Sequence, residues 1–292
     1  MATKTAKKSA RLVLRTMTKQ GKKIHWYQVD GVSAKGRGVT TLLSNGTPSG
    51  GLMQWAANCA ADCAIDEQDV WLPLAERDRG AAYDYLRKAS DRDRDAAANR
   101  GSEVHALAEQ LMAGKTVEVP EEIEGHVDQF IAWHEAWQPE LVASEFVIVN
   151  WTRWYFGRSD LLVKVKGWPG HEDQESLVLL DIKTSRGGPY EKDAVQLTAY
   201  RHAEEICLAP DDKGNCWDLE PMPAVAGVGV LHLSADAYAI HPVAEALDQR
   251  LFAQFLHIMR VAEFYGSGWK AEDKGWSRDV FRGVLVDPET KF

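Results

Sequence analysis

The sequence predicts an α+β fold in which helices flank one central mixed sheet. Apolar runs at 141–149, 154–166, 176–183 and 225–233 have the length of strands, and helical patterns precede the first run and separate the third from the fourth. The order helix, three strands, helix, strand is typical of an α/β sandwich. With 292 residues, 45% hydrophobic content and no internal repeat, the chain can bury the core that this fold needs.

Residues 1–23 predict a basic and flexible tail. They carry eight Lys or Arg residues and no acidic residue, whereas the whole chain has a formal net charge of -9. A solvated tail and an arm that binds phosphates both fit this composition. Because the overall charge is negative, any nucleic acid must bind at a local patch.

Residues 24–98 predict a hairpin followed by helices that are added to the core. The stretch 24–29 is rich in aromatic and β-branched residues and runs into the turn Asp30-Gly31, and 39–43 is expected to continue the hairpin. Helices are predicted over 51–65 and 75–90, separated by a break at Trp71-Leu72-Pro73.

Residues 99–292 predict the core of the fold and a C-terminal helix. Helical patterns cover 100–112, ended by Gly114, and 122–137, ended by Pro139. Two strands then join through Asn150-Trp151-Thr152, and a polar loop over 167–175 leads to the third. The remaining predicted elements are a helix over 190–207, the strand over 225–233 and a helix over 242–265.

The third predicted strand ends in charged residues, which indicates a site. Side chains alternate along a strand, so Asp181 and Lys183 project from one face while Ile182 points to the other. Charges at the end of a buried strand must be paired, ligated or solvated. The spacing by itself also fits a structural Asp–Lys ion pair.

Asp160 lies at the start of the neighbouring predicted strand, and hairpin geometry would bring its carboxylate beside that of Asp181. Two adjacent carboxylates repel unless a divalent cation neutralises them, and oxygen ligands suit Mg²⁺ or Mn²⁺. The carbonyl of Ile182 is a further candidate ligand. A bound cation activates water for attack on phosphorus, and Lys183 would position the hydroxide or stabilise the developing charge.

Four blocks of residues follow one another in the order of a known family. They are Gly101-Ser102-Glu103-Val104-His105, Gly157 to Asp160, Asp181-Ile182-Lys183-Thr184-Ser185 and Gln196-Leu197-Thr198-Ala199-Tyr200. Together they resemble the PD-(D/E)XK nuclease superfamily, specifically its RecB-like branch of phage recombination exonucleases and CRISPR-associated RecB-like exonucleases. The resemblance covers residues 100–205.

The resemblance implies a restriction-endonuclease-like core with N-terminal helical additions, and it assigns roles to individual residues. His105 joins the metal site, Asp160 and Asp181 are the metal carboxylates, and Lys183 is the catalytic lysine. Gln196 and Tyr200, four apart on one helical face, would support the centre and contact DNA.

Two departures from the family pattern leave this chemistry intact. Asp181 stands where many relatives have Glu, and Ser159 stands where the family name has Pro.

Some relatives hold an iron–sulfur cluster through one cysteine before the histidine helix and three near the C-terminus. The cysteines of this chain do not follow that arrangement, so free thiols rather than a cluster are expected; they are Cys59, Cys63, Cys207 and Cys216.

Several further residues are secondary candidates. Arg158, Thr184 and Ser185 flank the centre and would hold phosphates. Glu109, one helical turn after His105, and Glu145, on the preceding strand, are candidates for outer or supporting metal ligands, with a solvent-facing role as the alternative. Trp151 and Trp154 near a hairpin tip would stack on unpaired bases or pack at the rim.

The sequence therefore predicts a metal-dependent DNA exonuclease that processes ends for recombination or repair. A structure-selective or nicking endonuclease and a DNA-binding accessory protein with the nuclease fold are the alternatives. The expected partners are DNA ends or single strands and a single-strand annealing or recombination protein. No apolar run is long enough for a bilayer span and no P-loop is present, so a cytoplasmic, ATP-independent enzyme is expected. The resemblance to phage-encoded members implies a bacterial or phage origin.

Overall fold

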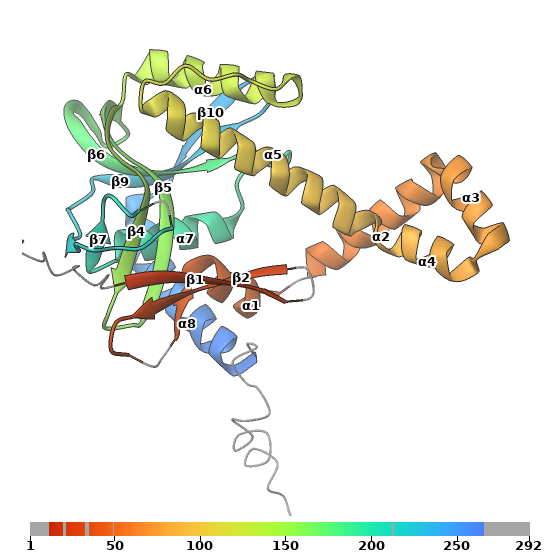
Figure 1. The fold of residues 1–292 in the computed structure, drawn as a ribbon. Helices are drawn as coiled ribbons and strands as arrows, with labels where there is room; N and C mark the ends of the chain where they lie inside the picture. The colour runs from red at the N-terminus through yellow and green to blue at the C-terminus, as the bar shows by residue number, and fades with distance from the viewer. Residues whose placement is uncertain (1–11, 20–21, 33–34, 49, 212, 266–292) are drawn as a thin grey trace, which may run out of the picture.

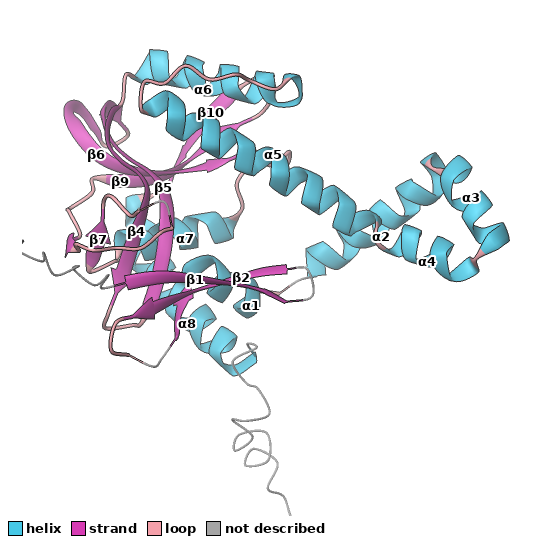
Figure 2. Ribbon diagram, in the orientation of Figure 1, coloured by secondary structure: helices cyan, strands magenta, loops and turns pink. Residues whose placement is uncertain are grey.

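A curled mixed sheet lies between two sets of helices in the computed structural model, and a helical arm projects from this body (Figures 1 and 2). The structure describes residues 12–19, 22–32, 35–48, 50–211 and 213–265. The strands are β1 (Leu12–Lys19), β2 (Lys22–Val29), β3 (Lys35–Gly38), β4 (Glu140–Asn150), β5 (Tyr155–Trp168), β6 (His171–Lys183), β7 (Glu205–Cys207), β8 (Glu220–Pro221), β9 (Gly227–Leu233) and β10 (Tyr238–Pro242). The helices are α1 (Val39–Gly46), α2 (Gly50–Asp66), α3 (Gln68–Arg77), α4 (Arg79–Arg87), α5 (Ala89–Met112), α6 (Glu124–Trp137), α7 (Glu191–Arg201) and α8 (Asp248–Tyr265), with 3-10 turns η1 (Glu121–Ile123) and η2 (Glu245–Leu247).

The four central strands of the sheet are the four that the sequence predicts. The strands β4, β5 and β6 form an antiparallel meander, and β6 then pairs with β9 in parallel. The parallel step requires a crossover, which α7 supplies between β6 and β9. The prediction of a mixed sheet flanked by helices is confirmed.

Each face of the sheet carries its own apolar core. In β6, Leu179 packs with α1, α7 and α8, whereas Leu180 and Ile182 pack with α5 and α6. This alternation is the period of two that marks a strand with both faces covered. It leaves Asp181 and Lys183 on the α7 side, as predicted, where the core ends.

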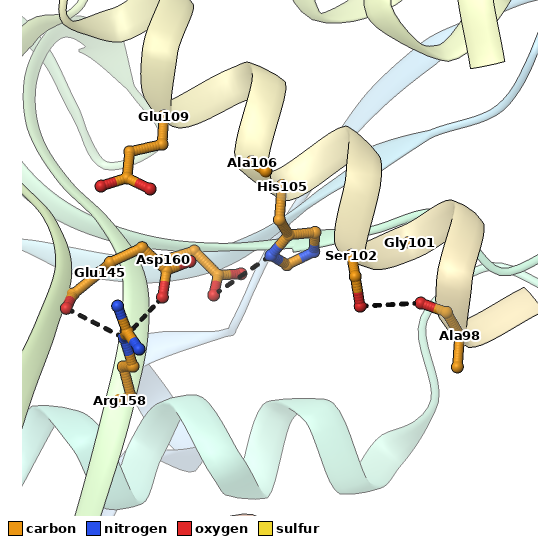
Figure 3. Close-up of a pocket in the computed structure, with 9 residues that line it drawn as sticks. All are labelled: Ala98, Gly101, Ser102, His105, Ala106, Glu109, Glu145, Arg158 and Asp160. Carbon is orange, nitrogen blue, oxygen red and sulfur yellow. Dashed lines mark hydrogen bonds and ion pairs between the residues drawn. The ribbon is translucent and has the colours of Figure 1, made fainter. Parts of the chain in front are cut away.

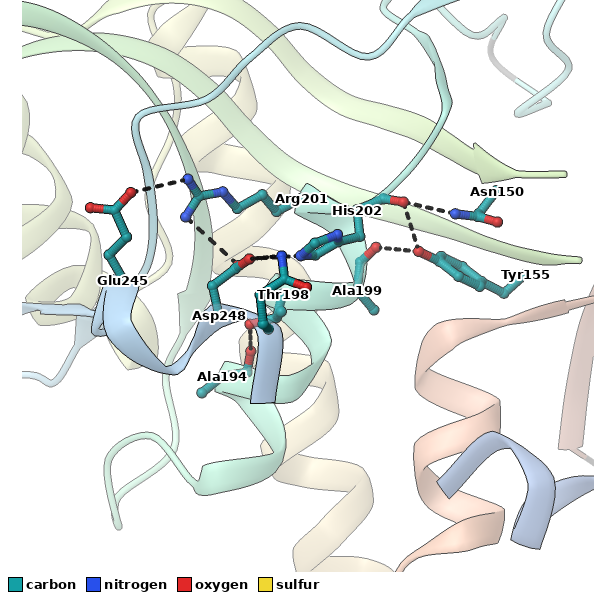
Figure 4. Close-up of polar contacts among 10 residues, drawn as sticks. Asn150, Tyr155, Ala194, Thr198, Ala199, Arg201, His202, Glu245 and Asp248 are labelled. Carbon is teal, nitrogen blue, oxygen red and sulfur yellow. Dashed lines mark hydrogen bonds and ion pairs between the residues drawn. The ribbon is translucent and has the colours of Figure 1, made fainter. Parts of the chain in front are cut away.

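Polar contacts join α7 to α8 (Figure 4). His202, which ends α7, lies 2.7 Å from the Asp248 carboxylate at the start of α8, and its ring stacks on Phe252. Arg201 reaches the same carboxylate at 3.7 Å. The Tyr155 hydroxyl donates to the carbonyl of Ala199, so β5 holds α7 from the other side. These contacts set the position of α7 over the sheet.

The basic tail is shorter than the sequence predicts. Residues 1–11 lie outside the described residues, but Leu12–Lys19 forms β1 and pairs with β2, which begins at Lys22 rather than at residue 24. Leu12 is fully buried, and its N–H donates to the carbonyl of Cys216 at 3.2 Å. The prediction of a tail to residue 23 was wrong because Leu12–Lys19 pairs with the neighbouring β2 and because Leu12 also bonds to the distant Cys216.

The hairpin does not continue through residues 39–43, which form the first turns of α1. Their β-branched residues favour a strand, but Val39, Leu42 and Leu43 share one helical face and are buried. Gly46, the last residue of α1, packs closely against α8: a Cβ at this position would come 2.3 Å from the carbonyl oxygen of Ile258. Packing against α8 therefore overrides local propensity.

The helical arm consists of α2, α3, α4 and the first half of α5 (Figure 1). The helix over 51–65 is confirmed as α2, but the predicted break at Pro73 lies inside α3. The break occurs at Asp78, whose carboxylate accepts from the N–H groups of Gly80 and Ala81 and caps α4. The long α5 then begins at Ala89, well before residue 100, and runs from the arm to the core.

Three further boundaries differ from the predictions. The polar loop over 167–175 is mostly strand, because β5 and β6 continue as a ribbon with a turn at Pro169-Gly170. The helix predicted over 190–207 ends at Arg201 and gives way to β7, and the strand β10 was not predicted. The last helix begins at Asp248 instead of 242. In the described part of the chain, no helix is both long and apolar enough to cross a membrane.

Candidate metal centre

Three neighbouring strands each contribute one carboxylate to a row across the sheet. Asp160 precedes Leu161 and Asp181 follows Leu180, and these leucines are cross-strand partners in the antiparallel pair β5–β6. Glu145 on β4 lies between residues whose partners are Leu161 and Ser159, so it stands opposite Asp160. Like charges in such positions repel one another, which makes this row unfavourable without a cation.

His105 on α5 closes the row from the helical layer. Its Nδ1 lies 3.5 Å from the Asp160 carboxylate, and its Nε2 lies 3.0 Å from the carbonyl oxygen of Ile182. Both partners are acceptors, so the protonated ring satisfies both contacts. Burial lowers the pKa of His105, but Asp160 and the more distant carboxylates outweigh burial and raise this pKa to about 9.

Asp160 is held in its ionised form. Burial raises the pKa of its carboxyl group, but His105, Lys183 and the N–H of Ile182, which donates to Oδ2 at 2.7 Å, together bring this pKa below the usual value. The Ile182 carbonyl, a predicted metal ligand, accepts from His105 in this structure. Asp160 therefore has the central position of the site.

Asp181 is held by two other predicted residues. Gln196 on α7 donates to its Oδ1 at 2.8 Å, and the Lys183 ammonium group contacts its Oδ2. Burial and the charge of Asp160 raise the pKa of Asp181 to about 7, even though Lys183 opposes this shift. Burial lowers the pKa of Lys183, but Asp181 outweighs burial, and the net shift is upward.

Two glycines of the motif blocks lie where the elements of the site meet. A Cβ on Gly157 would come 2.4 Å from a ring carbon of Tyr200, and one on Gly101 would come 3.3 Å from the Thr184 hydroxyl. Tyr200 is 1% exposed and lies against β5. The predicted supporting position of Tyr200 fits this packing, but its predicted contact with DNA is wrong because the ring is buried.

An open cavity of about 470 Å³ borders the row of carboxylates (Figure 3). Glu109, Glu145 and Asp160 reach it from α5, β4 and β5. The full lining is Ala98, Gly101, Ser102, His105, Ala106, Glu109, Glu145, Arg158 and Asp160. Neither Asp181 nor Lys183 lines this cavity; the Lys183 side chain is 27% exposed, whereas that of Asp181 is buried.

Three side chains of the site form a group that could hold a metal ion. Among the described residues, His105, Glu145 and Asp160 offer ligand atoms that all lie within 4.8 Å of one another. Imidazole nitrogen and carboxylate oxygen are both common ligands of divalent cations, and this set does not by itself select one metal. Asp181, whose carboxylate contacts Gln196 and Lys183, is not part of this close group.

The phosphate-binding candidates separate into two groups. Arg158 lines the cavity, with its side chain 43% exposed. Thr184 packs beside Gly101, and the Ser185 hydroxyl donates to the carbonyl of Gly188 within the loop after β6. Neither Thr184 nor Ser185 lines the cavity. Arg158 is therefore placed for an anion that enters it.

The hairpin tryptophans pack at the rim of the sheet. The rings of Trp151 and Trp154 lie 5.9 Å and 5.4 Å from that of Phe156, measured between centroids. This geometry fits the packing alternative.

The cysteines form two groups, with Cys59 and Cys63 on α2 in the arm and the buried Cys207 and Cys216 in the sheet core.

Comparisons with known proteins do not identify a family for this chain. No family model and no curated protein matches the chain. A solved structure described as "Crystal structure of SSO0001" is similar at 16% sequence identity and a TM-score of 0.28, covering 58% of this chain and 73% of that one. A similarity of this size carries no inference about activity.

Proposed function

We propose that this protein is a divalent-cation-dependent deoxyribonuclease of the PD-(D/E)XK superfamily, in its RecB-like branch. One observation carries the proposal. Asp160 on β5 lies beside Asp181 and Lys183 on β6, His105 contacts Asp160, and His105 and Asp160 line an open cavity. A structural ion pair would explain Asp181 and Lys183, but it would not explain a histidine and further carboxylates around them.

Each residue has a role in phosphodiester hydrolysis. Asp160, His105 and Asp181 would hold the cation, with Gln196 orienting the Asp181 carboxylate. The bound cation lowers the pKa of water and offsets negative charge on the phosphate. Lys183, which contacts the Asp181 carboxylate, would position the attacking hydroxide or stabilise the developing charge.

DNA ends are the proposed substrate. The motif blocks that resemble the RecB-like branch support DNA end processing for recombination or repair. The net charge of -9 supports a short local contact with the phosphate backbone rather than a broad basic surface. Arg158 at the cavity supplies positive charge for such a contact.

The test is a cleavage assay with Mg²⁺ or Mn²⁺ on end-labelled linear and covalently closed circular DNA. We expect the linear molecules to be degraded and the closed circles to persist. Asp181→Ala and Lys183→Ala should each lower the rate about 100-fold or more, the size typical for losing one group that stabilises transition-state charge. Lys164→Ala, an exposed lysine on β5, is the matched control.

The other outcomes separate the alternatives. Cleavage of closed circles would identify an endonuclease. Binding of DNA without cleavage across several divalent cations would favour an accessory protein with the nuclease fold. If wild-type protein neither cut nor bound any of these substrates, the proposed function would be wrong.

A further inference from the structure

The ion pair between Arg158 and Glu145 stands inside the proposed cation site. The Arg158 Nε donates to the Glu145 carboxylate at 2.6 Å and to its backbone carbonyl at 3.2 Å (Figure 3). The two terminal guanidinium nitrogens have no acceptor among the described residues. Arg158 thus uses one edge for Glu145 and keeps the other edge for the cavity that it lines.

The backbone directs Glu145 toward this site at some cost in strain. Its φ of 49° lies in the left-handed region, which a residue with a Cβ rarely adopts. Ala143 and Phe146, an odd and an even position, both pack in the core on the α7 side, so the alternation of β4 breaks between them. Such strain persists where the surroundings impose it, and it is common at functional sites.

Glu145 lies beside a second negatively charged side chain, and its positively charged partner is Arg158. It stands opposite Asp160, and both offer oxygen atoms to the group completed by His105. Arg158 is the positive charge that balances Glu145 in this structure. A divalent cation at the same ligands would supply that charge in its place and weaken the hold of Glu145 on the guanidinium group.

We propose that Glu145 is a ligand of the active-site cation and that Arg158 is its exchangeable counter-ion. Arg158 pairs with Glu145 before the cation binds and moves to a phosphate of the DNA once the cation has bound. This inference rests on the proposed function, since it names how the same site couples its cation to its substrate. Coupling of this kind is reciprocal, so DNA must also tighten cation binding.

The cation arm of the test measures Mn²⁺ binding by calorimetry without DNA. Glu145→Gln should weaken Mn²⁺ binding about tenfold or more, within the range for losing a residue that supports a metal site. Arg158→Gln should tighten it several-fold, because the cation no longer displaces a guanidinium group. In the double variant the gain from Arg158→Gln should disappear, which distinguishes exchange at Glu145 from a general effect of positive charge.

The matched controls lie on the same two strands. Glu140 and Lys164 form an ion pair of 2.6 Å between β4 and β5 away from the cavity, so Glu140→Gln and Lys164→Gln should leave Mn²⁺ binding unchanged. Glu145→Gly guards against misfolding, because glycine accepts the positive φ while removing the carboxylate. It should fold and bind Mn²⁺ as weakly as Glu145→Gln.

The DNA arm uses a labelled single-stranded oligonucleotide and the Lys183→Ala background, which prevents cleavage. Mn²⁺ should tighten oligonucleotide binding, and Arg158→Gln should remove most of that gain. The inference is overturned if Arg158→Gln changes Mn²⁺ affinity no more than Lys164→Gln, or if its effect persists with Glu145→Gln. Failure of the nuclease proposal would appear separately, as wild-type protein that leaves DNA intact although it binds Mn²⁺.

Discussion

At the scale of single residues, the site is a balance between carboxylates and the cations that hold them. Asp160 is engaged by His105, Asp181 by Lys183, and Glu145 by Arg158. Each carboxylate therefore has a positive partner inside the protein before any metal arrives. A divalent cation must compete with these partners, and protons take part in that competition.

Cation binding should strengthen as the pH rises from 6 to 9. The pKa of His105 is raised to about 9 and that of Asp181 to about 7, so both groups carry protons at lower pH that a cation must displace. Displacing one proton from His105 weakens binding about tenfold for each pH unit below 9. Calorimetry with Mg²⁺ across this range checks the prediction, and a flat profile for wild-type protein would contradict it.

Gly157→Ala should destabilise the fold by about 1–3 kcal/mol, the usual cost of overpacking a core. The added Cβ would come 2.4 Å from the ring of Tyr200, which is buried and has no space to move. Urea unfolding measures the change. Gly51→Ala on α2 is the control, because its Cβ meets nothing within 4 Å and should stabilise the helix by up to about 1 kcal/mol.

At the scale of elements, the meander β4–β5–β6 sets the spacing of the carboxylates while α5 and α7 supply the groups that hold them. His105 comes from α5 and Gln196 from α7, on opposite faces of the sheet. The arrangement depends on each helix keeping its position over the strands. The contacts between α7 and α8 are therefore part of the support of the site.

Asp248→Ala should lower stability by about 1–3 kcal/mol, because it leaves the half-buried His202 and Arg201 without the carboxylate that they share. Glu245→Ala is the matched control. It removes another carboxylate near Arg201, but Glu245 is 73% exposed, and such a pair contributes about 0–1 kcal/mol. Thermal unfolding compares the two variants, and equal losses would show that Asp248 does not join the helices.

At the scale of the whole molecule, the clustered negative charge links the stability of the fold to the proposed cation. Glu145, Asp160 and Asp181 lie in one row near the middle of the sheet, and their repulsion acts on the strands that form the core. Binding that favours the folded chain raises its stability by mass action. The stability of the entire protein should therefore depend on divalent cations.

Mg²⁺ should raise the melting temperature of the wild-type protein relative to the same protein in EDTA. At about 100 times its dissociation constant the cation adds about 2.7 kcal/mol, which corresponds to several degrees for a domain of this size. Asp160→Asn should lose most of this rise because Asp160 is central to the ligand group. A rise of the same size in both proteins would place the cation elsewhere.

Local patterns were enough to predict the centre of the molecule. The strands around Leu162, Leu179 and Val230 have long apolar runs, because a strand covered on both faces must be apolar throughout. The alternation within β6 placed Asp181 and Lys183 on one face, and the meander brought Asp160 beside them. These features depend on residues that are close in sequence or joined by one hairpin.

Only the tertiary structure decided the features that depend on distant partners. Leu12 bonds to the distant Cys216 in addition to its pairing with β2, and Val39 lies in a helix because α8 covers that face. The burial of Tyr200 follows from its packing on Gly157. The place of Glu145 follows from one positive φ, and no local pattern encodes where such a backbone sends its side chain. The sequence by itself determined which residues are candidates for the proposed chemistry, whereas long-range packing determined which of them meet.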